Sequence, residues 1–150
     1  MLELLSVVVV AFAVRGARSD HAAPVAAWAP IVVCDEVRIE LDTAALVPTS
    51  GAASIEPVRA RLRWSLLAPD VSPAAWAQGV RMTIDEVEVD CASASSRTLT
   101  SRAFAADGAL VPGASLVTTE PAWRRGPPAS VGALVVAAVC RSVHGASGAA

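Results

Sequence analysis

The segment VRARLRWSL, at residues 58–66, is the most informative part of this chain about its fold. Apolar side chains and arginines alternate along it without a break. Successive side chains of a β-strand point to opposite faces of the sheet, so this period of two predicts a strand with one buried face and one solvent face. The buried face carries Val58, Ala60, Leu62, Trp64 and Leu66, and the solvent face carries Arg59, Arg61 and Arg63.

Two other segments alternate in the same way, and we predict strands at residues 36–42 and 84–91. In the first strand, the core residues are Val37, Ile39 and Leu41, and the solvent residues are Glu36, Arg38, Glu40 and Asp42. In the second, the core residues are Val87, Val89 and Cys91, and the solvent residues Glu86, Glu88 and Asp90 form an acidic stripe.

A hairpin is predicted next along the chain. Residues 97–104 and 109–111 are its strands, and Asp107 and Gly108 between them tolerate the positive φ of a tight turn. One-sided alternation and short connections favour an antiparallel sheet with one solvated face over a parallel sheet buried on both faces. We therefore expect an antiparallel sheet of about five or six strands.

The period changes near the C-terminus, where a helix is predicted. Pro127 and Pro128 end any strand, and Ser130 is a good N-cap. Apolar residues then recur at helical spacing: Val131, Leu134, Val135, Ala138 and Val139, up to Cys140. A helix this apolar cannot face water, so it must pack on the hydrophobic face of the sheet. The predicted fold class is α+β.

Three cysteines, Cys34, Cys91 and Cys140, are too far apart in sequence for a zinc knuckle or a redox pair. In an exported protein an even subset should pair. A Cys91–Cys140 bond would join the sheet to the helix and stabilise the fold by about 4 kcal/mol in the chain-entropy model. Cys34 is then the odd thiol, which we interpret as a small buried hydrophobe. An intermolecular disulfide is the alternative.

The N-terminal segment is typical of a signal peptide. Leu4 to Val14 is apolar but too short to span a bilayer, and Ala17 and Ser19 match the pattern that signal peptidase recognises. We expect residues 1–19 to be removed and the protein to be exported. A buried first strand or helix is the alternative. Residues 20–30 are expected to be a flexible lead-in, residues 31–141 the domain, and residues 142–150 a flexible tail.

Composition excludes several classes of function. The 150 residues suffice for one domain, 54% are hydrophobic, and the formal net charge of −2 does not favour nucleic-acid binding. The two histidines, His21 and His144, fall in predicted arms, so a hydrolytic triad is not expected. The sequence has no glycine-rich phosphate loop and no metal-ligand helix motif. We expect a non-enzymatic protein without cofactor or metal.

Two surface features are candidates for partner binding. Arg59, Arg61 and Arg63 form an arginine ladder along one strand, which could hold a sulfated glycan or an acidic protein loop. The alternative is cross-strand pairing of the ladder with the acidic stripe. Trp76, in a predicted loop, is the second candidate, although simple loop packing would also explain it. Trp123 is expected to pack beneath the start of the helix.

The second half of the chain resembles the surface-adhesin protein E family of small exported bacterial domains. The resemblance rests on the VEVDC strand end at residues 87–91, Arg97 and Leu99, the Asp107–Gly108 turn, Trp123, and the PPAS run at residues 127–130 that leads to Cys140. It covers roughly residues 29–140. The chain departs from the family at Ala129, where glycine is frequent, and it has no tyrosine.

The resemblance implies an antiparallel sheet crossed by a C-terminal helix, with Cys91 bonded to Cys140. It also implies a non-enzymatic role, because the best-known member is an outer-membrane lipoprotein that binds vitronectin and laminin. We therefore expect a binding domain in the periplasm, at the cell surface or secreted, which recognises host matrix or serum proteins or another extracellular protein or glycan. The alternative is a structural or assembly component of the bacterial envelope that binds another bacterial protein, through Cys34 if that thiol pairs between molecules.

Overall fold

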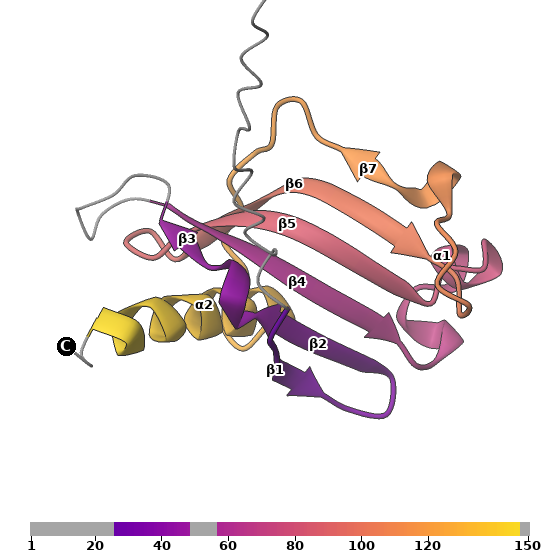
Figure 1. Cartoon of the computed structure of the whole chain (residues 1–150), viewed down its shortest axis with the longest axis horizontal. Coiled ribbons are helices and arrows are strands. Elements are labelled where there is room, and N and C mark those ends of the chain that lie inside the picture. The colour runs from indigo at the N-terminus through magenta and orange to yellow at the C-terminus, as the bar shows by residue number, and fades with distance from the viewer. Residues whose placement is uncertain (1–25, 49–56, 148–150) are drawn as a thin grey trace, which may run out of the picture.

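The computed structural model describes residues 26–48 and 57–147. Their principal element is one antiparallel sheet (Figure 1). Six of its strands are neighbours in the order β1 (Trp28–Val33), β2 (Val37–Asp42), β4 (Val58–Leu66), β5 (Met82–Asp90), β6 (Ser95–Phe104) and β7 (Leu116–Val117). Strand β3 (Val47–Pro48) pairs with the start of β4, beside β2. The three alternating segments are thus strands, as predicted. The expected signal peptide at residues 1–19 and His21 lie outside the described residues.

Short helices connect the strands. They are the 3₁₀ turns η1 (Thr43–Ala45), η2 (Pro69–Val71) and η3 (Pro112–Ala114), and the helix α1 (Pro73–Ala77). Figure 1 shows α1 at the end of the sheet where β4 passes to β5.

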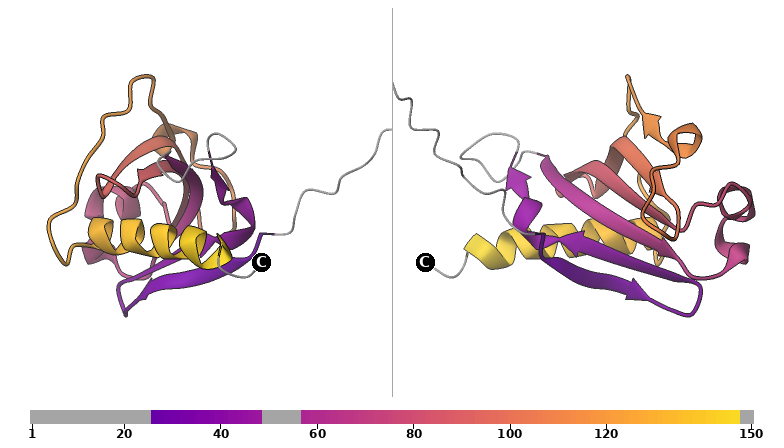
Figure 2. Two further views of the ribbon diagram at one scale, coloured as in Figure 1. Left: turned by 90° about the vertical axis from the view of Figure 1, so that its left-hand side faces the viewer. Right: turned by 45° about the vertical axis from the view of Figure 1, so that its right-hand side comes forward.

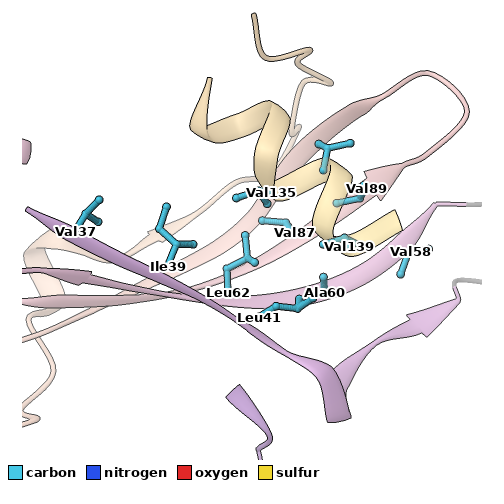
Figure 3. Close-up of a cluster of buried hydrophobic side chains, with 11 residues drawn as sticks. Val37, Ile39, Leu41, Val58, Ala60, Leu62, Val87, Val89, Val135 and Val139 are labelled. Atoms are coloured by element: carbon cyan, nitrogen blue, oxygen red, sulfur yellow. The ribbon is translucent and has the colours of Figure 1, made fainter. Parts of the chain in front are cut away.

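The core lies between the sheet and the C-terminal helix α2 (Val131–Ser147), which runs across one sheet face (Figure 2). Figure 3 shows Val135 and Val139 of α2 lying against Val87 and Val89 of β5. The buried cluster comprises Val37, Ile39, Leu41, Val58, Ala60, Leu62, Val87, Val89, Val135, Val136 and Val139. The predicted core faces of the three alternating strands are therefore confirmed except at the end of β4 and β5, where Trp64 and Cys91 are partly buried against the cluster and Leu66 is outside it.

The predicted disulfide is present. Cys91 and Cys140 are bonded with their Cα atoms 5.7 Å apart, so the bond joins the end of β5 to α2. Ser130 acts as predicted at the start of the helix, because its Oγ accepts a hydrogen bond from the Ala133 N–H at 3.3 Å. No helix in residues 26–48 and 57–147 is long and apolar enough to cross a membrane.

Three predicted boundaries were wrong. Strand β1 begins at Trp28, inside the expected lead-in, and α2 continues through residues 142–147 of the expected tail. The Asp107–Gly108 turn forms, with Gly108 at φ +83°, but residues 109–111 make only a single bridge from Leu110 to Phe104. Pro112 lacks a backbone N–H and starts η3, so the chain leaves the sheet and rejoins β6 only at β7.

The interpretation of Cys34 as a buried thiol was also wrong. Cys34 is free and exposed, in the turn between β1 and β2. Its Sγ lies 3.4 Å from the Val37 carbonyl oxygen. Its neighbours in the chain, Val33, Asp35 and Glu36, are exposed as well, so the whole turn lies at the surface.

Candidate binding face of the sheet

The sheet face opposite α2 carries a dense set of charged side chains, which we call the charged face. Alternation along β2, β4, β5 and β6 places these side chains there, and the strand register sets Arg63 opposite Glu40 and Arg59 opposite Glu88. The charged face is defined by Glu40, Asp42, Arg59, Arg61, Arg63, Glu88 and Arg97.

Two arginines of the ladder hold carboxylates of β2. Arg63 pairs with Glu40 at 2.7 Å, and Arg61 forms an ion pair with Asp42. Glu40 is only 8% exposed and Asp42 is fully buried, so the prediction that both face solvent was wrong. The added strand β1 explains the difference, because it sets Trp28 directly opposite Asp42 at this edge of the sheet.

Asp42 is the best satisfied carboxylate of the face. Besides Arg61, the backbone N–H groups of Ala27 and Ala44 each donate to its Oδ1 at 3.1 Å. Burial acts to raise the pKa of Asp42, but the hydrogen bonds from Arg61, Ala27 and Ala44 outweigh it and lower the pKa below 3.8. The carboxylate is therefore charged at neutral pH and depends on its donors.

Glu88 lies between two guanidinium groups. Its Oε1 accepts from Arg59 Nε at 3.2 Å, and its Oε2 accepts from Arg97 Nε at 2.7 Å. Glu88 is 5% exposed, which contradicts the prediction of a solvated side chain. Burial acts to raise its pKa, but the bonds from Arg97 and Arg59 outweigh it and lower the pKa below 4.5. One carboxylate thus serves two cations, and this triad keeps a net positive charge.

The expected pairing of the ladder with the acidic stripe is confirmed for one of its members. Arg59 pairs with Glu88 of β5, whereas Arg61 and Arg63 pair with β2 instead. Glu86 lies opposite Arg61 in the register but contacts Arg102, at 3.6 Å on the surface.

Two tryptophans stack on the arginines of the charged face. The ring of Trp28 lies 4.5 Å from the guanidinium of Arg63, and that of Trp123 lies 4.5 Å from the guanidinium of Arg97. The prediction that Trp123 packs beneath the helix was wrong. Its neighbour Arg124 forms a bridge with Ser96, which holds this segment beside the start of β6. Trp123 is 40% exposed and therefore remains available for contact.

Trp76, the other candidate contact residue, lies elsewhere. It belongs to α1 rather than to a loop, and Arg81 stacks on its ring at 3.6 Å. Arg81 also donates to the Trp76 carbonyl oxygen at 3.0 Å. The structure therefore brings Trp76 into the packing at the end of the sheet and does not join it to the arginine ladder.

The charged face has free capacity for hydrogen bonding mainly at Arg59. Its side chain is 63% exposed, compared with 36% for Arg61 and 29% for Arg63. A guanidinium has five N–H donors, and among residues 26–48 and 57–147 the hydrogen bond of the Arg59 guanidinium is the one from Nε to Glu88. The remaining donors suit carboxylate, sulfate or phosphate oxygens.

Asp85 is an ionisable group on the opposite face of the sheet, the one that faces α2. The register sets Asp85 opposite Leu62, on the core side, and its Oδ1 accepts a hydrogen bond from Ser101 Oγ at 2.6 Å. Burial raises the pKa of Asp85 above 3.8, although bonds from Ser101 and Thr83 oppose it. His144 is exposed on α2, with Nδ1 2.6 Å from the Cys140 carbonyl oxygen. Across the described parts of the chain, no cluster of three potential metal ligands occurs.

Comparison of the chain with protein-family models, with curated proteins and with solved structures found no match.

Proposed function

We propose that this chain is an exported, non-enzymatic binding domain of the surface-adhesin E type, which recognises an extracellular protein or glycan on its charged face. The observation that carries the proposal is the triad of Arg59, Glu88 and Arg97. A buried carboxylate fixes two guanidinium groups, yet Arg59 remains mostly exposed and an exposed Trp123 lies beside Arg97.

Such an arrangement is suited to binding because its side chains are already ordered. Association costs roughly 0.5–1.5 kcal/mol for each flexible side chain that it immobilises. Arg97 is held by Glu88 and by the Trp123 ring, so this cost is reduced at its position. Arginine and tryptophan are also enriched among the residues that dominate binding energy at protein interfaces.

Export is proposed on two grounds. The Cys91–Cys140 disulfide is typical of proteins that fold in oxidising compartments. The apolar run from Leu4 to Val14, followed by Ala17 and Ser19, fits a cleaved signal peptide. Host matrix or serum proteins are the partners that the surface-adhesin E resemblance suggests.

The test is a binding assay of the full chain on immobilised laminin, vitronectin and heparin. Arg59→Ala should weaken binding about tenfold, because it removes the most exposed donor while Arg97 still neutralises Glu88. Arg141→Ala is the matched control, since it removes an exposed cation from α2. Replacing the whole ladder is less informative because it would leave Asp42 buried without its arginine. Equal binding by the Arg59→Ala variant and the wild type would contradict the proposal.

The exposed thiol of Cys34 favours a second candidate, an envelope component that is linked covalently to another bacterial protein. This candidate predicts a larger species on non-reducing gels of native envelope, which is absent in a Cys34→Ser strain. Recovery of monomer alone from wild-type cells would exclude this linkage.

A further inference from the structure

An arginine of β2 extends the arginine ladder of β4 into a longer row. The strand register sets Arg38 opposite Ser65, which places Arg38 on the charged face. Alternate residues of one strand lie about 7 Å apart, and diagonal neighbours on adjacent strands lie about 7–8 Å apart. Four arginines thus follow one another at nearly equal steps over about 20 Å. We call this row the arginine stripe, and it consists of Arg38, Arg63, Arg61 and Arg59.

The carboxylates that pair with the stripe are buried. They are Glu40, Asp42 and Glu88. The arginines at the two ends of the stripe are accessible, because the side chain of Arg59 is 63% exposed and Arg38 is also exposed. A ligand that approaches the stripe therefore meets guanidinium groups before it meets carboxylates.

Accessible carboxylates lie beside the stripe or beyond its end. Glu86 of β5 lies beside it and contacts Arg102 of β6 at 3.6 Å. Asp35 and Glu36 belong to the exposed turn that precedes Arg38. These groups limit the cationic surface to a narrow row, so an anionic ligand that fits it is long and thin.

The two inner arginines of the stripe present prepositioned donors. Arg61 binds Asp42 through Nε and Nη2. Arg63 binds Glu40 through the same two nitrogens, and the Trp28 ring stacks on its guanidinium at 4.5 Å. The three nitrogens of a guanidinium point in three directions of one plane, so these contacts direct each Nη1 away from the carboxylate. Because the two groups are held in place, the ligand must supply acceptors at several angles.

We propose that the arginine stripe binds a linear sulfated polysaccharide. This inference rests on the proposed function and narrows its ligand to one class of glycan. Such a polymer carries anionic groups at intervals along a thin chain, and each sulfate offers three oxygens to the charge-assisted hydrogen bonds of guanidinium groups. A protein partner fits the stripe less well, because the centre of a protein interface is depleted in charged residues.

The test is calorimetric titration of the full chain with three probes. They are a heparin dodecasaccharide, the same dodecasaccharide after chemical desulfation, and a heparin disaccharide, which is too short to span the stripe. The sulfated dodecasaccharide should bind at least about tenfold more tightly than the other two, because it alone offers sulfates along the whole stripe. Its affinity should fall as the salt concentration rises, because the contacts lie at the surface.

Substitutions at the two ends of the stripe test whether one polysaccharide chain spans it. Arg38→Ala and Arg59→Ala should each weaken the binding of the sulfated dodecasaccharide about tenfold. The double variant should weaken it about a hundredfold, because the effects of such distant sites add. Neither substitution removes the last cation from a buried carboxylate, since Arg97 still pairs with Glu88, so the fold is kept. Arg141→Ala on α2 is the matched control and should bind like the wild type.

The outcomes separate this inference from the proposed function. If the chain binds laminin or vitronectin through Arg59 but does not bind the sulfated dodecasaccharide, the ligand is a protein, and the inference is overturned while the proposed function stands. Equal binding of the sulfated and desulfated dodecasaccharides, or equal binding by Arg38→Ala and Arg141→Ala, also overturns the inference. If the chain binds neither the two proteins nor any oligosaccharide, the inference and the proposed function both fail.

Discussion

Asp42 and Arg61 form the most tightly coupled pair on the charged face. Asp42 is fully buried, and its charge is compensated by one guanidinium and two backbone N–H groups. Arg59 has a different role, because its partner Glu88 keeps a second cation, Arg97, if Arg59 is removed. The arginines of one ladder thus differ in their contribution to stability although they alternate identically in the sequence.

The first prediction concerns these two arginines. Arg61→Ala should lower the free energy of unfolding by about 3 kcal/mol, because it leaves a buried charge unpaired. Arg59→Ala should lower it by less than about 1 kcal/mol, as is usual for an exposed ion pair. Urea denaturation of both variants measures the difference. Equal losses would show that Asp42 does not depend on Arg61.

Asp85 predicts a pH dependence of stability. Its pKa is raised in the folded protein, so the folded state binds its proton more tightly than the unfolded state does, and ionisation of Asp85 destabilises the fold as the pH rises above 3.8. Asp85→Asn should therefore stabilise the protein at pH 7 and have little effect at about pH 3, below the ordinary aspartate pKa. Urea midpoints at both pH values measure this, and a loss of stability at pH 7 would contradict the assignment.

Asp42 and Glu88 act in the opposite sense. Their pKa values are lowered in the folded protein, so their ionisation stabilises the fold. This contribution to the free energy of unfolding is complete above pH 4.5, and it is lost as the pH falls through their folded-state pKa values. The Asp85→Asn variant should keep this acid transition, which makes it an internal control for the measurement.

Among the elements, the connection into α2 contains one of the two alanines of the described residues with a positive φ. Ala129 adopts φ +60°, in the left-handed region that disfavours residues with a Cβ. Gly126, three residues earlier, packs so closely that an added Cβ would lie 2.8 Å from the Ala133 backbone nitrogen. The entry to the helix is thus fixed by one close approach and one unfavourable φ.

This strain predicts the effect of glycine at one position. Ala129→Gly should stabilise the protein by about 0.5 kcal/mol, because relief of the left-handed penalty exceeds the entropy that glycine adds to the unfolded chain. Ala137→Gly, inside α2, is the matched control and should destabilise by about 1 kcal/mol. Thermal denaturation compares the two. Destabilisation by both substitutions would show that Ala129 carries no such strain.

The sequence predicted the elements whose pattern is local, and it missed those that depend on tertiary pairing. Strands β2, β4 and β5 alternate over six residues or more, so their faces follow from the period alone. Strand β7 has two residues and exists only because it pairs with β6. The arginine ladder was predicted, but its partners on β2 were not. That pairing depends on the order of the strands in the sheet and on Trp28, which covers Asp42 at the sheet edge. The two-residue alternation of each strand contains neither piece of information.

Across the whole molecule, the two sheet faces have separate roles. The face under α2 holds the apolar core and the disulfide, and the other face holds the ion pairs. Substitutions on the exposed part of the charged face should therefore alter binding without loss of the core. This separation is what allows Arg59 to be tested for function apart from stability.

The disulfide also acts on the molecule as a whole. The bond closes a loop of 49 residues between Cys91 and Cys140. Its replacement by two serines should lower the free energy of unfolding by about 4 kcal/mol in the chain-entropy model. Cys34→Ser should change it by less than about 0.5 kcal/mol, because Cys34 is exposed. Urea denaturation measures the free energy of unfolding of both variants. Equal losses in the two variants would contradict the claim that the Cys91–Cys140 bond, and not Cys34, stabilises the fold.

This protein can bind an extracellular partner only if it is exported. Intact mass with peptide mapping, on protein recovered from the envelope and medium of native cells, is the decisive measurement. We expect a polypeptide that begins at Asp20, with Cys91 bonded to Cys140. A full-length polypeptide with three free thiols would contradict an exported binding domain, because such a protein would have stayed in a reducing compartment.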